Sequence, residues 1–198
     1  MKLYKFRSSS EFDFIVDILR YHRFHASLFK NLNDPMEGVF KQYSAKKTIS
    51  KLSKVINDKQ KEFRICSFSK TYKRLLLWAH YAEQFKGVCF EVEILSPNSF
   101  EILEIDYAPE PPCINWHEQD YRDIYSWKHE DWIHEEEIRL LTSNSYIDTS
   151  IKINSIFFGL RTESDFKWAI RKILPSDIKA FNTKMDYENS KIQIGQQL

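Results

Sequence analysis

The pattern of apolar and polar positions predicts several short strands. Residues 2–7 (KLYKFR) alternate loosely, and residues 63–69 (FRICSFS) are nearly all apolar until their last positions, as in a buried strand. Residues 88–94 (VCFEVEI) alternate strictly, so Glu91 and Glu93 project from one face. We expect 101–107 (EILEIDY) to pair with 88–94. The other predicted strands are 24–29, 135–141, 155–160 and 179–185, the last of which closes the sheet.

Helical spacing of apolar residues predicts helices between these strands. A helix follows the serines at 8–10, with an apolar face made by Phe14, Ile15, Ile18 and Leu19. In the segment 74–84, successive residues step by about 100° around the helix axis, so not all its large side chains are buried. We expect Tyr81 near a cleft and His80 hydrogen-bonded, and a buried stripe of Leu75, Trp78, Ala79 and Ala82. Two other predicted helices are 45–57 and the first part of 115–134. A further one is capped by Thr162 or Ser164, reaches about Leu174 and has Trp168 among its apolar residues.

The order of these elements favours one α+β domain over residues 1–185. Strands and helices do not alternate regularly, so we expect a mixed, mostly antiparallel sheet flanked by helices. The 198 residues suffice for one domain, and residues 186–198 are a polar tail that we expect to fray.

Composition and charge exclude several classes of protein. A net charge of +1 does not favour a general attraction to nucleic acid or to an anionic membrane. The four glycines lie far apart, so they cannot build a glycine-rich phosphate loop. The three cysteines include no C-x-x-C pair, so their spacing does not indicate a zinc site or a disulfide framework. With no signal-peptide pattern and no long apolar run, we expect a soluble, cytoplasmic protein.

Two carboxylates and an arginine form the first candidate site. On a strand, Glu135, Glu137 and Arg139 share one face, where the carboxylates repel each other unless a cation neutralises one of them. Such a pair suits the stabilisation of a cationic transition state, as in the cleavage of a glycosidic bond. The alternative interpretation is a solvated strand face with an ion pair of little energetic value.

Three further positions are candidates for binding or catalysis. Ser67 and Ser69 share a face at the end of their strand, and Arg7 at the end of the first strand suits bidentate binding of a phosphate. Each also has a structural interpretation, as serines that end a strand and as an exposed arginine. The residues from His129 to His134 lack the spacing of a metal site, so we expect no metal.

Five motifs occur in an order that resembles a bacterial family known only as domain of unknown function number twenty-nine seventy-one. The resemblance covers roughly residues 1–180. The motifs are LYKFR (3–7), NDPMEG (33–38), CSFS (66–69), LLLWAHYAEQFKGVCFEV (75–92) and WIHEEEIRL (132–140).

A more distant resemblance carries a functional implication. Arg7, then Ser67-Phe68-Ser69, then Glu135-Glu136-Glu137 follow the order of the Arg-Ser-Glu class of ADP-ribosyltransferases, each on a predicted strand. That class binds NAD in a cleft of a split sheet, without a glycine-rich loop. The segment with Trp127 and Trp132 lies where that class has its recognition loop.

The resemblance implies a role for each matched residue. Arg7 would hold an NAD phosphate, Ser67 would position the ribose with Ser69 beside it, and Glu137 would stabilise the oxocarbenium ion as nicotinamide leaves. Glu135 would orient or deprotonate the acceptor. Also implied in NAD binding are Tyr81, by stacking on nicotinamide, and the loop residues Asn33 and Asp34.

The implied function is transfer of ADP-ribose to a macromolecular acceptor, protein or nucleic acid, or hydrolysis of NAD. Such an activity suits a bacterial toxin or anti-phage effector. One alternative is a non-catalytic module that binds a partner or regulator protein through Trp78, Trp127 and Trp132. A second is a nucleic-acid-directed enzyme that uses the basic stretch 70–74.

Overall fold

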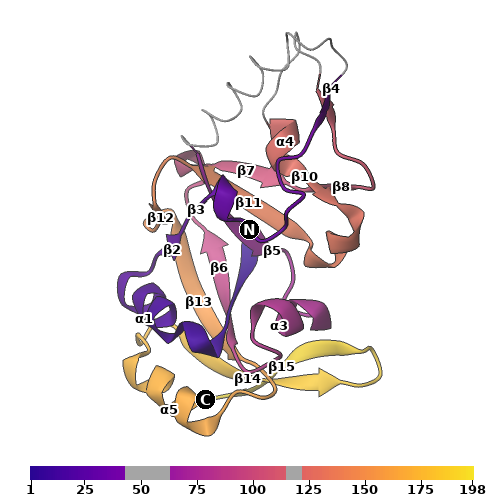
Figure 1. The fold of residues 1–198 in the computed structure, drawn as a ribbon. Helices are drawn as coiled ribbons and strands as arrows, with labels where there is room; N and C mark the ends of the chain where they lie inside the picture. The colour runs from indigo at the N-terminus through magenta and orange to yellow at the C-terminus, as the bar shows by residue number, and fades with distance from the viewer. Residues whose placement is uncertain (43–62, 115–121) are drawn as a thin grey trace.

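A nine-stranded sheet forms the frame of the computed structural model, which describes residues 1–42, 63–114 and 122–198 (Figure 1). The strand order is β15-β14-β13-β6-β1-β5-β11-β7, with β3 also paired to β5. All pairs are antiparallel except β13 with β14. The strands are β1 Lys2–Arg7, β3 Ser27–Leu28, β5 Arg64–Ser69, β6 Val88–Ile94, β7 Glu101–Glu104, β11 Glu137–Thr142, β13 Ile151–Phe158, β14 Lys179–Asp186 and β15 Lys191–Gln197.

Short helices and three small strand pairs complete the described part of the chain. The pairs are β2 Phe24–His25 with β12 Tyr146–Ile147, β8 Asp106–Ala108 with β10 Trp127–His129, and β4 Lys41–Gln42 with β9 Cys113–Ile114. The α-helices are α1 Phe12–Tyr21, α3 Leu75–Tyr81, α4 Arg122–Ser126 and α5 Ser164–Ile173. The 3-10 helices are η1 Ser9–Glu11, η2 Phe29–Asn31, η3 Pro97–Ser99 and η4 Glu130–Glu135.

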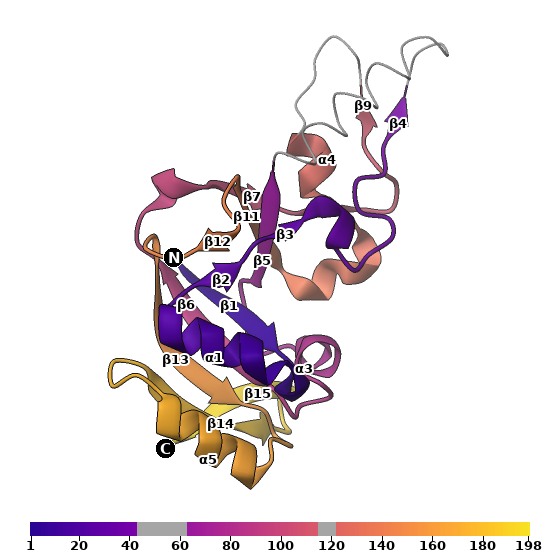
Figure 2. The ribbon, with the colours of Figure 1, turned by 60° about the vertical axis from the view of Figure 1, so that its left-hand side comes forward.

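Helices cover both faces of the sheet. Figure 2 shows α1 and α5 along the sheet, and their buried residues Ile15 and Ile170 join one apolar cluster with Phe90 of β6. The opposite face packs on α3, where the fully buried Trp78 meets Phe6 edge to face. The alternation of the strands therefore supplies apolar clusters on both sides of the sheet. The predicted mixed, mostly antiparallel α+β architecture is confirmed.

The sheet is nearly divided between β1 and β5. All six residues of β1 pair with β6, and all six of β5 pair with β11, but β1 and β5 share the single pair Tyr4 with Ser69. Beyond that pair the Lys5 ammonium donates a hydrogen bond to the carbonyl of Ser67 at 2.6 Å. Two halves of the sheet thus meet along a gap lined by side chains.

Two strand predictions are wrong in detail. Residues 101–107 do not pair with 88–94, because β1 and β13 already occupy both edges of β6. This segment instead divides into β7, which pairs with β11, and β8, which pairs with β10. The expected strand 24–29 is divided into β2 and β3.

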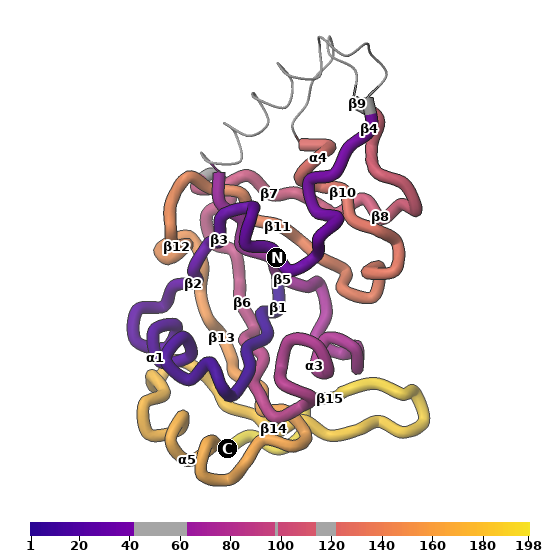
Figure 3. Tube along the Cα trace, viewed as in Figure 1, coloured from indigo at the N-terminus to yellow at the C-terminus, as the bar shows by residue number. Residues whose placement is uncertain are grey.

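The C-terminal tail is a strand rather than a frayed end. Residues 191–197 form β15, which pairs antiparallel with β14 and buries Ile192, so β14 does not close the sheet (Figure 3). The ladder hydrogen bonds, together with Ile192 and the partly buried Ile194, order a segment whose composition is polar.

The helix predictions also need correction. Phe14 and Trp168 are exposed, because α1 and α5 bury narrower stripes than the apolar pattern indicated. Helix α5 begins after Glu163, and the Thr162 hydroxyl donates to the carbonyl of Gly87 instead of capping the helix. His80 is exposed rather than enclosed in the core. The predicted helix 45–57 and residues 115–121 lie outside the described residues. No helix in the described part of the chain is long and apolar enough to cross a membrane.

Candidate functional site

A pocket of about 490 Å³ lies where β1 and β5 separate. Its volume falls within the range of small-molecule sites. Of the residues that the sequence predicted for the site, all line this pocket except Asp34 and Arg139, both of which are buried. Asp34 is buried just behind the lining, where its carboxylate accepts a hydrogen bond from the backbone N–H of Met36.

Strand register brings the serines and carboxylates together. In the antiparallel pair of β5 and β11, Glu137 lies opposite Ser69 and Arg139 opposite Ser67, so all four side chains share one face. Ser67 lies diagonally across from Glu137, and its hydrogen bond to that carboxylate helps to lower the pKa of Glu137. The faces expected for Ser67 with Ser69 and for Glu137 with Arg139 are present, and the register joins them into one.

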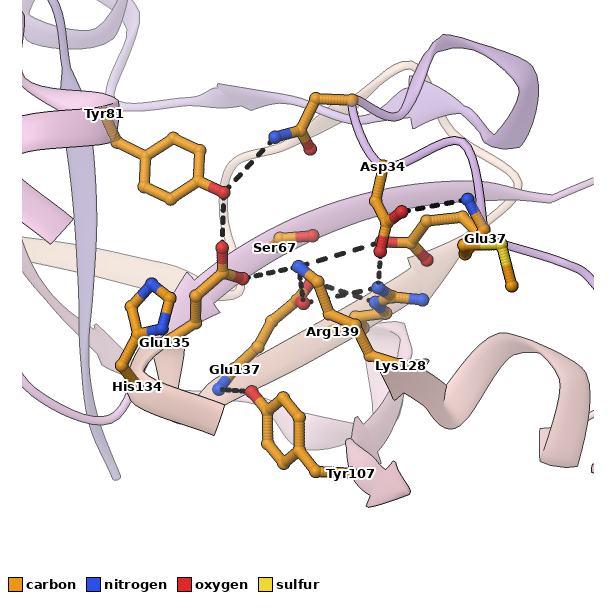
Figure 4. Close-up of polar contacts among 12 residues, drawn as sticks. Asp34, Glu37, Ser67, Tyr81, Tyr107, Lys128, His134, Glu135, Glu137 and Arg139 are labelled. Carbon is orange, nitrogen blue, oxygen red and sulfur yellow. Dashed lines mark hydrogen bonds and ion pairs between the residues drawn. The ribbon is translucent and has the colours of Figure 1, made fainter. Parts of the chain in front are cut away.

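Glu135 reaches the site by a different route from the one expected. It ends η4 rather than lying on β11, and Glu136 between them has a left-handed backbone with φ of 45°. The buried Lys128 of β10 lies between the two carboxylates and donates to both Glu135 and Glu137, the latter at 3.0 Å (Figure 4). A cation thus removes the repulsion that strand geometry alone would produce.

Arg139 is the second cation of this cluster and is fully buried. Its guanidinium binds both oxygens of Glu137, at 2.9 and 3.2 Å, and donates to Glu37 at 2.6 Å. A further donor reaches the backbone carbonyl of Tyr125 at 2.7 Å. Glu37 comes from the loop 33–38, so the Arg139 side chain joins that loop to β11.

These contacts set the protonation states of the cluster. Burial opposes ionisation of Glu137, but Arg139 and Lys128 outweigh it, so the pKa of Glu137 lies well below its ordinary value. Burial likewise opposes the charges of Lys128 and Arg139, while the neighbouring carboxylates raise both pKa values above the ordinary range. Glu137 is therefore an ionised carboxylate at any ordinary pH.

Two tyrosines hold the carboxylates in place. The Tyr81 hydroxyl donates to Glu135 and accepts from the side-chain amide of Asn33, which links α3 to the loop 33–38. The Tyr107 hydroxyl accepts a hydrogen bond from the backbone N–H of Glu137 at 2.8 Å. Burial, followed by the charge of Glu135, raises the pKa of Tyr81, so its phenol stays protonated.

The opposite wall of the pocket, on β1, is basic. Lys5 and Arg7 lie two residues apart on β1, so their side chains project from the same face of the strand. Both residues line the pocket, as does His25. The Nε atom of Arg7 is buried and has no hydrogen-bond partner among the described residues. Burial lowers the pKa of Lys5, and burial together with the nearby cations Arg64 and Arg7 lowers that of His25.

The end of β1 is fixed by Glu83, which follows α3. Its carboxylate accepts hydrogen bonds from the hydroxyls of Ser8 and Ser9 and from the N–H of Ser10, and these bonds lower its pKa to about 2. Glu83 is the first of three consecutive residues with positive φ, at 48°, 53° and 73°. This turn holds the chain immediately after Arg7.

Sequence reasoning missed Lys5, Glu37, Lys128 and Tyr107 as parts of the site. Glu37 lies inside the NDPMEG motif, so that motif was its one available signal. Lys128 lies in an aromatic, charged stretch without periodicity, and nothing in its neighbourhood indicated burial. In the described residues no group of three or more metal-ligating side chains occurs.

The structure also bears on the two alternative functions. Trp78 and Trp127 are buried, at 0% and 2% exposure, so the expected tryptophan surface is wrong for these two residues. In the basic stretch 70–74, Lys70 pairs with Glu104 and Arg74 with Glu136. These pairs neutralise part of the charge that would attract nucleic acid.

A scan against protein-family models found no family that matches the chain, and searches of curated proteins and of solved structures also found no match. The two resemblances noted in the sequence therefore stay predictions.

Proposed function

We propose that this pocket binds NAD and that the protein cleaves the bond between nicotinamide and ribose, transferring ADP-ribose to a macromolecular acceptor or to water. One observation carries the proposal: an unpaired guanidinium nitrogen of Arg7 and the ionised Glu137 belong to residues that line the same pocket. NAD has the matching polarity, with an anionic pyrophosphate and a cationic nicotinamide ring.

The basic wall suits the pyrophosphate. Arg7 offers a buried N–H without a partner, and a buried donor left unpaired carries a free-energy penalty that a phosphate oxygen would remove. The Lys5 ammonium lies on the same wall, with the Ser67 carbonyl as its partner. This is how a nucleotide is bound without a glycine-rich loop, in agreement with the distribution of glycines.

The acidic wall suits the reacting sugar. As nicotinamide leaves, positive charge develops at C1′ and the ring oxygen of the ribose, and a fixed anion beside it stabilises the transition state more than the ground state. Glu137 is held ionised by Arg139 and Lys128 and needs no reorganisation. Ser67, hydrogen-bonded to Glu137, is placed to contact a ribose hydroxyl.

The test is calorimetric binding of NAD, followed by measurement of free nicotinamide released by the wild type and by Glu137→Gln. We expect the variant to bind NAD but to cleave it on the order of a hundredfold more slowly, because the amide lacks the negative charge. Glu93→Gln is the matched control, since Glu93 lies on β6, contacts Asn154 and does not line the pocket.

The outcomes separate clearly. A folded wild-type protein that neither binds nor consumes NAD, with or without protein and nucleic-acid acceptors, would overturn the proposal. If the wild type and Glu137→Gln cleave NAD at equal rates, the proposed NAD cleavage stands, but Glu137 is not the carboxylate that stabilises the transition state. Thermal melting of both variants shows that each is folded before its activity is compared.

A further inference from the structure

The three carboxylates of the site differ in how their oxygen atoms are bound. Glu135 accepts from the Tyr81 hydroxyl on Oε1 and from the Lys128 ammonium on Oε2. Glu137 accepts from Arg139 on both oxygens and from Lys128 on Oε2. Neither carboxylate has an oxygen free of these donors, so taking up a proton would displace a hydrogen bond from a cation or a phenol.

Glu37 is bound on one side only. Its Oε1 accepts from Arg139 at 2.6 Å and lies 3.8 Å from the Lys128 ammonium (Figure 4). Its Oε2 is buried and has no hydrogen-bond partner among the described residues, although the side chain is only 4% exposed and lines the pocket. A proton can therefore be added at Oε2 without breaking any existing contact.

The charges around Glu37 favour that protonation. It faces Arg139 and Glu137 on β11 and Lys128 on β10, with Asp34 in its own loop. Glu37, Glu135 and Glu137 with the two cations carry one net negative charge, which a proton on Glu37 would cancel. Burial, and secondarily the charge of Glu137, raises the pKa of Glu37 in spite of the two cations.

We propose that Glu37 is the catalytic base that takes the proton from the nucleophile attacking the ribose of NAD. The inference rests on the proposed function. A bond forms between the nucleophile, water or an acceptor group, and C1′, while the bond from C1′ to the nicotinamide nitrogen breaks. Its electron pair passes to the ring, which leaves as neutral nicotinamide, and the nucleophile's proton passes to Oε2 of Glu37.

This assignment divides the work between the carboxylates. Glu137 stays ionised and stabilises the cationic sugar, and Glu37 changes its protonation state. Glu135, the base implied by the resemblance, instead positions Tyr81 and Lys128. Because Oε2 is shielded from bulk water, the proton it receives comes from a group bound within the pocket.

The experiment is a pH profile of nicotinamide release for the wild type, Glu37→Gln, Glu37→Asp and Glu135→Gln. A base must be deprotonated to act, so the wild-type rate should rise with pH through the raised pKa of Glu37 and then level off. Glu37→Gln should lose this rise and about a hundredfold or more in rate at the plateau, with NAD binding retained. Glu37→Asp should restore part of the pH-dependent rise and part of the plateau rate.

Control variants separate the base from its surroundings. Glu135→Gln should be slower but should keep the pH-dependent rise, and Glu104→Gln, in an exposed ion pair with Lys70, should match the wild type. Carbon-13 NMR of the glutamate carboxyls, which needs no NAD, should show Glu37 titrating above the ordinary range and Glu137 below it.

Each result decides the inference. An unchanged pH profile in Glu37→Gln, with an active wild type, overturns the role of Glu37 and leaves the proposed function standing. Loss of the pH-dependent rise in Glu135→Gln instead assigns the base to Glu135. A wild type that consumes no NAD overturns both proposals, and a Glu37 carboxyl that titrates in the ordinary range removes the electrostatic basis of this one alone.

Discussion

The two walls of the pocket use charge in opposite ways. On β11 and its neighbours, Lys128 and Arg139 are buried and each bonds to more than one carboxylate. On β1, Lys5 contacts a single carbonyl, and the Nε atom of Arg7 contacts no partner among the described residues. The two cations of the acidic wall thus have carboxylate partners without a ligand, whereas a donor of the basic wall has none.

This difference teaches which charges belong to the fold and which to a ligand. A buried ion-pair cluster fixes geometry, and removing one member leaves the others unpaired at a large energetic penalty. An unpaired donor at a pocket wall contributes little to folding and gains a partner only on binding. Substitutions on the acidic wall should therefore lower the free energy of unfolding, whereas substitutions on the basic wall should lower the affinity for NAD.

Lys128→Met should give the largest loss of stability. It removes the cation between Glu135 and Glu137 while keeping the length of the side chain, and breaking a buried pair in this way lowers the free energy of unfolding by about 3–5 kcal/mol. Urea denaturation measures the change. The control is Lys70→Met in an exposed pair, expected to lose less than about 1 kcal/mol, and equal losses for the two would refute the contrast.

Acid should destabilise the acidic wall through Glu137. Because its pKa in the folded protein lies below the ordinary 4.5, its stabilising contribution is present above that value and is lost as the pH falls below it. We expect the free energy of unfolding to drop more between pH 7 and pH 3 in the wild type than in Glu137→Gln. Glu37, with its raised pKa, contributes with the opposite sign and offsets part of the drop.

At pH 7 the same Glu137→Gln variant should be less stable than the wild type. Considered alone, the strand pattern of the sequence indicates little change or a gain in stability, because the substitution relieves repulsion between Glu135 and Glu137. Urea curves at both pH values test the two statements together. If the variant is as stable as the wild type at pH 7, the charge of Glu137 is not needed to stabilise the buried cations Arg139 and Lys128.

Arg7→Ala should have the smallest effect on folding. We expect a change of less than about 1 kcal/mol in the free energy of unfolding, but a loss of about tenfold or more in NAD affinity, because a charged hydrogen bond to phosphate is removed. Calorimetry and urea denaturation measure the two quantities. Arg20→Ala, at an exposed position on α1, should change neither. A loss of stability as large as that of Lys128→Met would show that the walls do not differ.

Local patterns predicted much of the sheet and part of the site. The period of two placed Ser67 with Ser69 on one face of β5 and Glu137 with Arg139 on one face of β11, and the register of the two strands agrees with both. Alternation also located β1 and β6. These features depend on neighbours two residues apart, which a single sequence displays directly.

What the sequence did not display depends on distant partners. The contact between Glu37 and Arg139 spans 102 positions, and no local rule indicates it. Lys128 is buried against the usual preference of lysine, because three carboxylates surround it. The pairing of 101–107 was mispredicted for a related reason, since the occupancy of both edges of β6 depends on β13, which is much later in the chain.

The single residue pair between β1 and β5 has a consequence for the dynamics of the protein. With so few backbone bonds between them, β5, β11 and β7 form one unit and β1, β6 and β13 another, and each can open locally while the other stays folded. We expect amide hydrogens of β11 and β6 to exchange with different opening free energies. A ligand that contacts both walls would join the two units, so its binding should slow exchange far beyond the residues it contacts.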